Sequence, residues 1–288
     1  MKERARQIIL SCENVTVTFD GFKAVDGMNL RLEEGELRFL IGPNGAGKTT
    51  MLDMICGKVK PSAGVIRFRG EKGEVDLARK KEHQIARLGI GRKFQAPSVF
   101  TGLTVSENLE LAMCRSKGVW ATLGARLSRR ERTEIGEQLE RIGLTDKASW
   151  LAGRLAHGEK QWLEIGMLLM QKPRLLLLDE PVAGMTDAET EKTGELLKRI
   201  AEDHTVLVVE HDMAFVRAYA TKVTVMHEGR LLKEGTMEEV QRDRAVIAVY
   251  LGQEQEEEPF GKREGVEQGV EKRLLQEGRM ENVVGTTA

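Results

Sequence analysis

The chain of 288 residues carries 44 Lys and Arg against 45 Asp and Glu, and its net charge of −1 argues against a dedicated nucleic-acid binder. Three scattered cysteines without a CxxC pair argue against a disulfide scaffold or a zinc site and favour a reducing compartment. No secretory signal and no run of about 18 apolar residues occurs, so we expect a soluble cytoplasmic chain that reaches a membrane only through partners.

Strand-like and helical patterns alternate through the first half of the chain. Apolar runs bounded by glycine or polar residues predict strands at 13–19, 35–42, 64–70 and 88–94. A glycine-rich turn follows the second of these runs and leads into a helix from about Lys48. From Thr104 to Leu144 apolar positions recur at intervals of three and four, which predicts helices, with Ser106 as a candidate N-cap.

The second half continues the alternation and predicts an α/β core. The patterns predict a helix at 159–171, a strand at 174–181, a helix at 187–202, a strand at 205–212 and a hairpin at 222–235. The unbroken apolar run of the first strand indicates a sheet that is covered on both faces. A mainly parallel sheet is therefore expected, with a helical subdomain inserted at about 98–152. Charge and glycine dominate after Gly252, which predicts a flexible tail at 253–288.

The stretch GPNGAGKTT fits the pattern G-x-x-x-x-G-K-[ST] and lies where a strand passes into a helix. Glycine leaves room for backbone N–H groups to converge on phosphate oxygens, and the helix start adds its positive dipole end. Lys48 places a positive charge against the phosphates, and the Thr49 hydroxyl is a candidate Mg²⁺ ligand. The predicted nucleotide-phosphate site comprises Gly42, Pro43, Asn44, Gly45, Ala46, Gly47, Lys48, Thr49 and Thr50.

Two further polar groups follow buried strands. Asp179 ends an apolar run, where a carboxylate can hold Mg²⁺ directly or through water, and Glu180 can act as general base toward the attacking water. His211 follows the next apolar strand and can donate to the γ-phosphate and orient that water. These residues can also be solvated, capping or turn residues, but beside a phosphate loop they predict a hydrolytic site with Lys48, Glu180 and His211 as catalytic groups.

This set of motifs resembles the nucleotide-binding subunit of an ATP-binding-cassette (ABC) transporter over residues 8–252. The resemblance implies a P-loop α/β fold with an antiparallel β subdomain and an inserted α-helical subdomain, and it implies ATP and Mg²⁺ as ligands. It further implies that Phe19 stacks on adenine, with Phe22 as the alternative. Gln95 corresponds to the glutamine that reaches Mg²⁺, and Ala183–Asp187 to the loop that communicates across the dimer.

The stretch LAHGEKQ lies where this family carries its LSGGQ signature, which contacts the γ-phosphate of ATP held by the other subunit. The corresponding residues are Leu155, Ala156, His157, Gly158 and Glu159. Gly158 and the free N–H groups of the helix start are retained, but Ala156 lacks the serine hydroxyl, whose loss costs about 1.5–3 kcal/mol. Glu159 adds repulsion if it faces the phosphate and none if it points along the helix. We therefore expect a weakened signature that still closes on ATP.

Within the family, residues 155–193 and the closing run VIAVYLG resemble the branch for branched-chain amino acid, amide and urea uptake. The signature histidine and the stretches KQWLEIGMLL and AGMTDAETEKT are most similar to the D-type ATPase subunit of bacterial urea importers. The resemblance therefore implies an ATP-hydrolysing subunit for urea uptake, with a branched-chain amino acid or short amide importer as the alternative. A non-hydrolysing regulatory nucleotide binder is the alternative of another class, and Glu180 and His211 argue against it.

The resemblance also implies the partners. A second ABC ATPase subunit is expected, with a heterodimer favoured over a homodimer, together with two membrane permease subunits. A periplasmic or other extracytoplasmic binding protein delivers the solute, and no nucleic acid takes part. The chain is then expected at the cytoplasmic face of the plasma (inner) membrane, where the permeases hold it.

Overall fold

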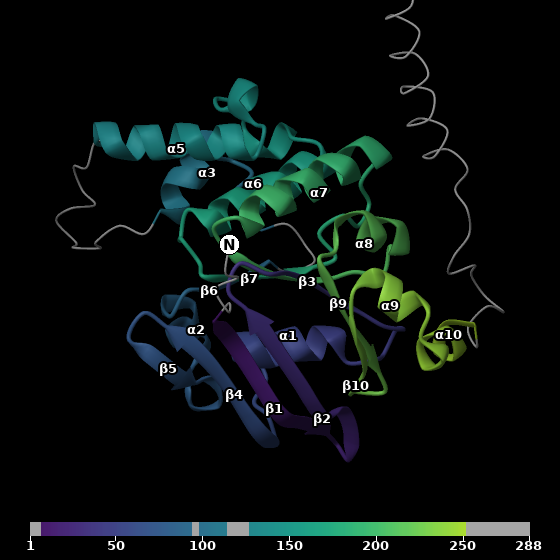
Figure 1. Ribbon diagram of the computed structural model, residues 1–288. Coiled ribbons are helices and arrows are strands. Elements are labelled where there is room, and N and C mark those ends of the chain that lie inside the picture. The colour runs from purple at the N-terminus through teal and green to yellow at the C-terminus, as the bar shows by residue number, and fades with distance from the viewer. Residues whose placement is uncertain (1–6, 94–97, 114–126, 252–288) are drawn as a thin grey trace, which may run out of the picture. The chain divides into compact units, whose positions relative to one another are not determined.

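The computed structural model describes residues 7–93, 98–113 and 127–251, and Figure 1 shows the arrangement of its helices and strands. The elements of the first half are β1 (Ile8–Phe19), β2 (Phe22–Glu33), β3 (Leu37–Ile41), α1 (Lys48–Cys56), β4 (Ala63–Gly70), β5 (Gly73–Asp76), η1 (Leu77–Arg79), α2 (Glu82–Arg87), β6 (Ile90–Lys93), α3 (Val105–Ala112) and α5 (Arg129–Arg141). Those of the second half are η2 (Thr145–Lys147), η3 (Ala152–Arg154), α6 (His157–Leu169), β7 (Leu175–Asp179), α7 (Asp187–Ala201), β8 (Thr205–Val209), α8 (Met213–Tyr219), β9 (Lys222–His227), β10 (Arg230–Gly235), α9 (Met237–Gln241) and α10 (Arg244–Leu251).

Two sheets organise the chain up to Val249. One has the strand order β2-β1-β4-β5 and is antiparallel throughout. The other has the order β10-β9-β3-β8-β7-β6, in which β9 to β6 run parallel and β10 alone is antiparallel to its neighbour. A mainly parallel α/β core beside a separate antiparallel sheet confirms the predicted fold class.

The core lies on both faces of the six-stranded sheet. Helix α1 lies between the two sheets, and α6 and α7 lie on the other side of the six-stranded sheet (Figure 1). Strands β3, β7 and β8 are buried along their whole length, as the unbroken apolar run around β7 predicted. Because these three strands are parallel neighbours, the segments that follow them meet at one edge of the sheet.

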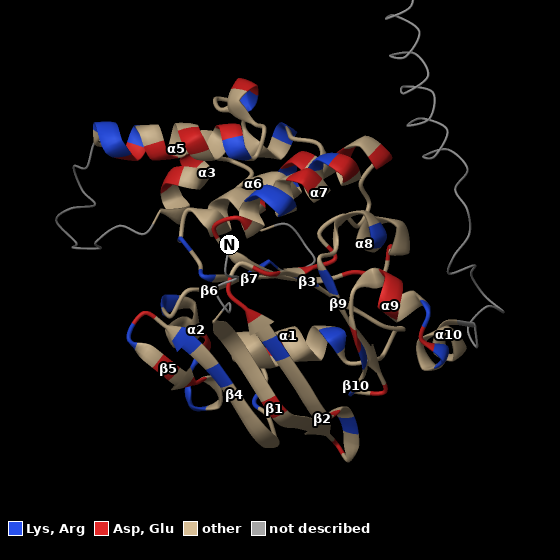
Figure 2. Cartoon of the chain, viewed as in Figure 1, with Lys and Arg blue, Asp and Glu red and all other residues tan. Residues whose placement is uncertain are grey.

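The outer helices are amphipathic. Helix α7 buries Leu196, Leu197 and Ile200 on one face, and Figure 2 shows that acidic and basic residues are interspersed along α5 and α7. The Thr186 hydroxyl caps α7 by accepting from the Glu189 N–H at 3.3 Å, and the Glu189 carboxylate accepts from the Thr186 N–H at 2.9 Å. This reciprocal cap fixes where the loop after β7 ends.

Element boundaries differ from the prediction where caps and turns decide them. The N-cap of α3 is Thr104 and not Ser106, because the Thr104 hydroxyl accepts from the Glu107 N–H at 3.2 Å while the Glu107 carboxylate accepts from the Thr104 N–H at 2.7 Å. Helix α6 begins at His157, two residues before the predicted start at 159. Strand β2 was not predicted, because charged residues and Gly27 interrupt its apolar pattern. The strand forms through its antiparallel hydrogen bonds with β1, which the local pattern does not show.

The chain divides into a compact unit that extends to Val249 and a second unit, Tyr250–Ala288, of which residues 250–251 are described. The predicted tail at 253–288 lies outside the described residues. The described part of the predicted helical subdomain at 98–152 contains α3, α5, η2 and the first residue of η3, and its extent stays a prediction. Within the described ranges, no helix has the length and apolar character needed to cross a membrane.

Candidate nucleotide site

The predicted phosphate loop forms the turn between β3 and α1. Gly42 follows β3 with φ +151°, and Gly47 precedes α1 with φ +96°. A Cβ on Gly42 would lie 2.1 Å from the Met226 carbonyl oxygen, and one on Gly47 would lie 2.4 Å from the Ala24 carbonyl oxygen. Both positions therefore require glycine. Since α1 has no side-chain cap, its first N–H groups stay open to an anion.

Lys48 is folded back over this loop. Its Nζ donates to the carbonyl oxygens of Gly42 at 2.7 Å and Pro43 at 3.0 Å, and the residue is only 9% exposed. Burial lowers the pKa of Lys48, and the carboxylates of Glu180 and Asp179 oppose this shift. The ammonium group thus lies where phosphate oxygens can replace the two carbonyls as its partners.

Asp179 ends β7 and has one carboxylate oxygen without a partner. Its Oδ2 accepts from Nη2 of Arg92 at 3.4 Å, while Oδ1 is buried and has no hydrogen-bond partner among the described residues. Burial raises the pKa of Asp179, and the Arg92 guanidinium and the Thr49 hydroxyl oppose the rise. An open carboxylate oxygen near a hydroxyl suits Mg²⁺, which prefers oxygen ligands. Asp179 and Thr49 therefore fit the predicted metal site, whereas Gln95, the third predicted ligand, lies outside the described residues.

Glu180 and His211 lie close together beyond neighbouring strand ends. Nδ1 of His211 is 3.5 Å from Oε1 of Glu180, and the Glu180 N–H donates to the Val209 carbonyl oxygen at 2.9 Å. Glu180 has φ +47°, a left-handed conformation that costs a residue other than glycine about 1–2 kcal/mol. Its side chain is 31% exposed, so a water molecule can reach the carboxylate. Backbone strain of this kind gathers at functional sites.

Glu210, which sequence reasoning missed, is a buried carboxyl group behind this pair. The residue is 1% exposed, and its two oxygens accept from the Val182 N–H at 3.3 Å and the His211 N–H at 3.2 Å. Burial raises the pKa of Glu210 to about 7, although these N–H groups oppose the rise. Glu210 thus connects the loop after Glu180 with the loop that carries His211. In the sequence, its position next to His211 was the feature that pointed to a place in the site.

Glu210 is expected to make the protein less stable as the pH rises. The pKa of Glu210 is about 7 in the folded chain against 4.5 as its ordinary value, so the stabilisation is complete below the ordinary pKa and is lost as the pH rises through the folded one. Relative to Glu210→Gln, the wild-type free energy of unfolding should fall by roughly 2–3 kcal/mol between about pH 5 and pH 8. Urea titrations of both proteins across this range measure the difference, and parallel pH dependences would contradict the assignment.

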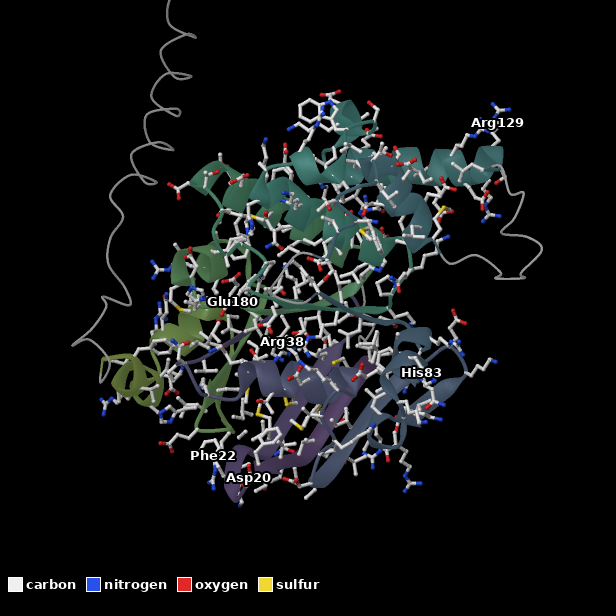
Figure 3. All side chains as sticks on the ribbon, turned by 180° about the vertical axis from the view of Figure 1, so that it is seen from behind. Asp20, Phe22, Arg38, His83, Arg129 and Glu180 are labelled. Carbon is white, nitrogen blue, oxygen red and sulfur yellow. The ribbon has the colours of Figure 1, made fainter. Side chains whose placement is uncertain are left out.

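Phe19 and Phe22 pair across the tip of the β1–β2 hairpin. Asp20 and Gly21 form the turn with φ +46° and φ +87°, and Figure 3 shows Asp20 and Phe22 together at this tip. The two phenylalanines are 46% and 68% exposed. Ala24, which lies against the phosphate loop, is two residues from Phe22, roughly 7 Å along the strand. Both rings are thus available near the loop, and the stacking role of Phe19 stays a prediction.

The predicted signature residues form the start of α6. Ala156 is the N-cap and offers no side-chain acceptor, whereas α3, α5, α7, α8 and α9 each begin with a side-chain cap. The Glu159 carboxylate accepts from the Ala156 N–H at 3.1 Å and pairs with Lys147, so it lies at the start of the helix beside a positive charge. Lys147 balances the charge of Glu159 at this helix start, and the effect of Glu159 on a bound phosphate stays a prediction. His157 lies against the loop after β7, at the Ala183 carbonyl oxygen.

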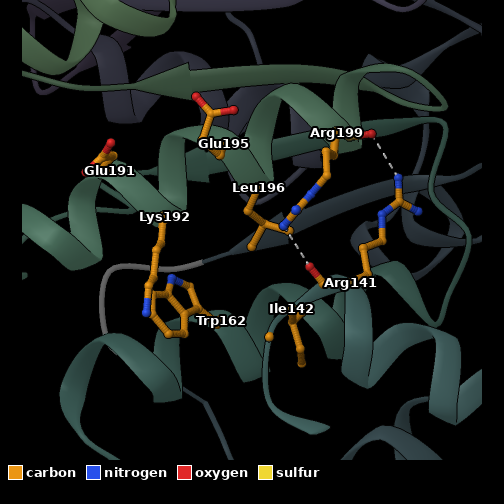
Figure 4. Close-up of a pocket in the computed structure, with 9 residues that line it drawn as sticks. Arg141, Ile142, Trp162, Glu191, Lys192, Glu195, Leu196 and Arg199 are labelled. Carbon is orange, nitrogen blue, oxygen red and sulfur yellow. Dashed lines mark hydrogen bonds between the residues drawn. The ribbon is translucent and has the colours of Figure 1, made fainter. Parts of the chain in front are cut away.

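A separate cavity of about 310 Å³ lies among α5, α6 and α7 (Figure 4). The Trp162 ring forms part of its wall, with the Lys192 ammonium 5.8 Å from the ring centroid. Arg141 and Arg199 close one end by donating to each other's carbonyl oxygens at 3.1 and 3.2 Å. None of the residues that line this cavity belongs to the predicted nucleotide site.

Comparison with protein families gives two matches. A family described as ABC transporter matches residues 25–183, and one described as branched-chain amino acid ATP-binding cassette transporter matches residues 232–256. Among curated proteins, the high-affinity branched-chain amino acid transport ATP-binding protein BraF of Pseudomonas aeruginosa is 38% identical and covers 85% of this chain and 98% of its own length. The corresponding LivG protein of Salmonella typhimurium is 37% identical over 86% of this chain and 99% of its own.

Solved structures of ATP-binding cassettes share the fold. The ADP conformation of the ABC transporter cassette MJ1267 gives a TM-score of 0.74 at 29% identity, covering 86% of this chain and all of that one. A dimeric post-hydrolysis state of the cassette MJ0796, bound to ADP and phosphate, gives a TM-score of 0.66 at 26% identity over 80% of this chain and 99% of that one. The similarity therefore extends over nearly the whole of each cassette.

Proposed function

Because the chain belongs to the branched-chain amino acid transport (LivG/BraF) family of ABC transporter ATPases, we propose that it powers the uptake of a branched-chain amino acid through partner permeases. The observation that carries the proposal is the meeting of the phosphate loop, Asp179–Glu180 and His211 beyond the adjacent strands β3, β7 and β8. This arrangement brings an anion-binding turn, a metal-binding carboxylate and a candidate base to one edge of the sheet.

In the proposed reaction, ATP binds along the phosphate loop. The Lys48 ammonium exchanges the carbonyl oxygens of the loop for phosphate oxygens, and the open N–H groups of α1 bind the same phosphates. A water oxygen attacks the γ-phosphorus while its proton passes to the Glu180 carboxylate, and the bond to the bridging oxygen breaks to leave ADP. His211 orients this water, and Phe19 stacks on the adenine ring.

Asp179 and Thr49, with Gln95 as the third proposed ligand, are the residues that would hold Mg²⁺. When bound, Mg²⁺ neutralises charge that develops on the β- and γ-phosphates. The open Oδ1 of Asp179 supports this assignment, because a buried carboxylate oxygen without a partner is costly unless a ligand satisfies it.

The proposed assembly pairs this chain with a second ATPase subunit, which is a different chain or a second copy. In that dimer, the open helix start at Leu155–Glu159 faces the nucleotide of the other subunit, and the absent serine hydroxyl at Ala156 weakens this contact. Four exposed apolar residues lie on α3 or beside it and offer a suitable surface for the permeases: Phe100, Leu111, Trp150 and Leu151. Docking there holds the chain at the cytoplasmic face of the membrane.

The solute is the point on which the sequence patterns and the relatives differ. The patterns at 155–193 favour urea, whereas the relatives described above are named as branched-chain amino acid transport proteins. No residue of an ATPase subunit contacts the solute in the proposed assembly, so the patterns at 155–193 have no physical link to urea. We therefore give the relatives more weight than these patterns in proposing the solute. Urea remains the second candidate because the resemblance of the signature and the following loop points to that branch.

The uptake experiment distinguishes these solutes. Cells with and without this gene are supplied with labelled leucine or labelled urea at low external concentration, where passive entry of urea is slow. We expect leucine uptake to be lost and urea uptake to persist in the deletion strain. Loss of urea uptake alone would replace the proposed solute with urea, and loss of neither would reject both.

A further inference from the structure

His157 has two partners that compete for the same ring nitrogen. Its Nε2 lies 3.2 Å from the Ala183 carbonyl oxygen and 3.2 Å from the amide nitrogen of Gln161. A single ring nitrogen can donate to the carbonyl or accept from the amide, but it cannot do both. His157 therefore bonds either to the loop after Glu180 or to its own helix.

The loop that His157 reaches has one end fixed to the sheet. The Glu180 N–H donates to the Val209 carbonyl oxygen at 2.9 Å, and the Val182 N–H donates to buried Glu210 at 3.3 Å. Ala183 is the next residue, and it is exposed. The contact with His157 thus falls where the loop leaves its attachment to the strands.

The other end of the loop is fixed to the helices. Trp162 of α6 donates from Nε1 to Oγ1 of Thr193 on α7 at 2.8 Å, and the same Oγ1 lies 3.2 Å from Sδ of Met185. Glu189 of α7 also packs over the start of α6, because a Cβ on Gly158 would lie 2.5 Å from its Oε1. The residues between these two attachments are Ala183 and Gly184, and His157 contacts Ala183.

We propose that His157 is a positioning residue whose exchange between Ala183 and Gln161 sets whether the loop Ala183–Asp187 moves with α6. When Nε2 carries a proton, it donates to the Ala183 carbonyl oxygen and couples the loop to the helix. When Nε2 carries no proton, it accepts from the Gln161 amide, and the loop is released from the helix. The inference rests on the proposed function, in which the start of α6 faces the nucleotide of the second subunit and this loop communicates across the dimer. A glycine, the residue that the family signature has here, could make neither bond.

Three variants separate the two bonds of His157. His157→Phe keeps a planar ring but makes neither bond, and His157→Gln restores an amide donor. Gln161→Leu removes the competing partner and leaves Nε2 to Ala183. Because His157 is exposed, its substitutions should leave the fold intact, and His157→Ala provides a second test of the lost contact.

Hydrogen exchange of the full-length chain, followed by mass spectrometry of the peptide over 181–189, tests the link without hydrolysis. His157→Phe and His157→Ala should speed exchange there by about fivefold, His157→Gln should restore protection, and Gln161→Leu should increase it. Equal exchange in all four variants and the wild type would overturn the proposal. This readout needs no turnover, so it remains decisive even if the proposed transport function fails.

Hydrolysis by the assembled complex tests the consequence for the reaction. His157→Phe should lower kcat by about fivefold and change KM for ATP by less than about twofold, since ATP binds at the phosphate loop of its own chain. His157→Gln should recover most of the lost kcat. A wild-type kcat in His157→Phe, or a His157→Gln protein as slow as His157→Phe, would contradict the positioning role.

Discussion

Replacing Glu180 by glutamine is expected to lower the rate of ATP hydrolysis by at least about 100-fold, because a general base contributes 10²- to 10⁴-fold to such reactions. Glutamine keeps the size of the side chain but cannot accept the proton of the attacking water. ATP binding should persist, since the phosphates are bound by Lys48 and the loop, and the ATP-bound dimer should accumulate. Phosphate release at saturating MgATP and binding of a fluorescent ATP analogue measure the two effects.

Glu195→Gln is the matched control for Glu180→Gln. It makes the same chemical change on α7, where Glu195 is exposed and paired with Lys198 at 3.2 Å. Hydrolysis should therefore stay within about twofold of wild type, as expected for a surface substitution. Unchanged hydrolysis in Glu180→Gln would overturn the assignment of the base, while an equal loss in both variants would point to a structural effect.

Replacing Lys48 by alanine is expected to weaken ATP binding by about 10- to 100-fold, which corresponds to the 1.5–3 kcal/mol of a charge-assisted hydrogen bond. Alanine offers no donor that could replace the ammonium group in binding the phosphate oxygens. Hydrolysis at physiological ATP concentration should then be undetectable. Titration with a fluorescent ATP analogue gives the affinity directly.

Lys58→Ala controls for the loss of positive charge near α1. Lys58 follows the same helix, its side chain is 54% exposed, and its Nζ lies 3.6 Å from Asp53. Because exposed ion pairs contribute little, ATP affinity should not change measurably. Equal weakening in both lysine variants would mean that net charge, and not the position of Lys48 in the loop, governs binding.

Much of the site could be predicted from the sequence because its motifs follow strands. The phosphate loop, Asp179–Glu180 and His211 each come after an apolar run, and parallel neighbouring strands carry such segments to one edge. The α/β alternation likewise predicts the fold class. These inferences need only local patterns and the geometry of a parallel sheet.

Contacts between distant segments could not be predicted in this way. The burial of Glu210 depends on the loop at Val182 lying across it, and the pairing of Arg92 with Asp179 depends on β6 lying beside β7. Glu159 illustrates the same limit, because its direction depends on Lys147 in a preceding turn. Local patterns report which residues are polar, but tertiary packing decides which polar groups meet.

The most direct test of the central claim measures solute accumulation and ATP hydrolysis together in vesicles that contain the complete transporter. With labelled leucine and binding protein on the extracytoplasmic side of the transporter, the wild type should accumulate leucine on the opposite side as it hydrolyses MgATP. The vesicles with Glu180→Gln should lose both activities together, by at least about 100-fold. Continued leucine accumulation by the Glu180→Gln transporter would contradict the claim that hydrolysis at this site powers import.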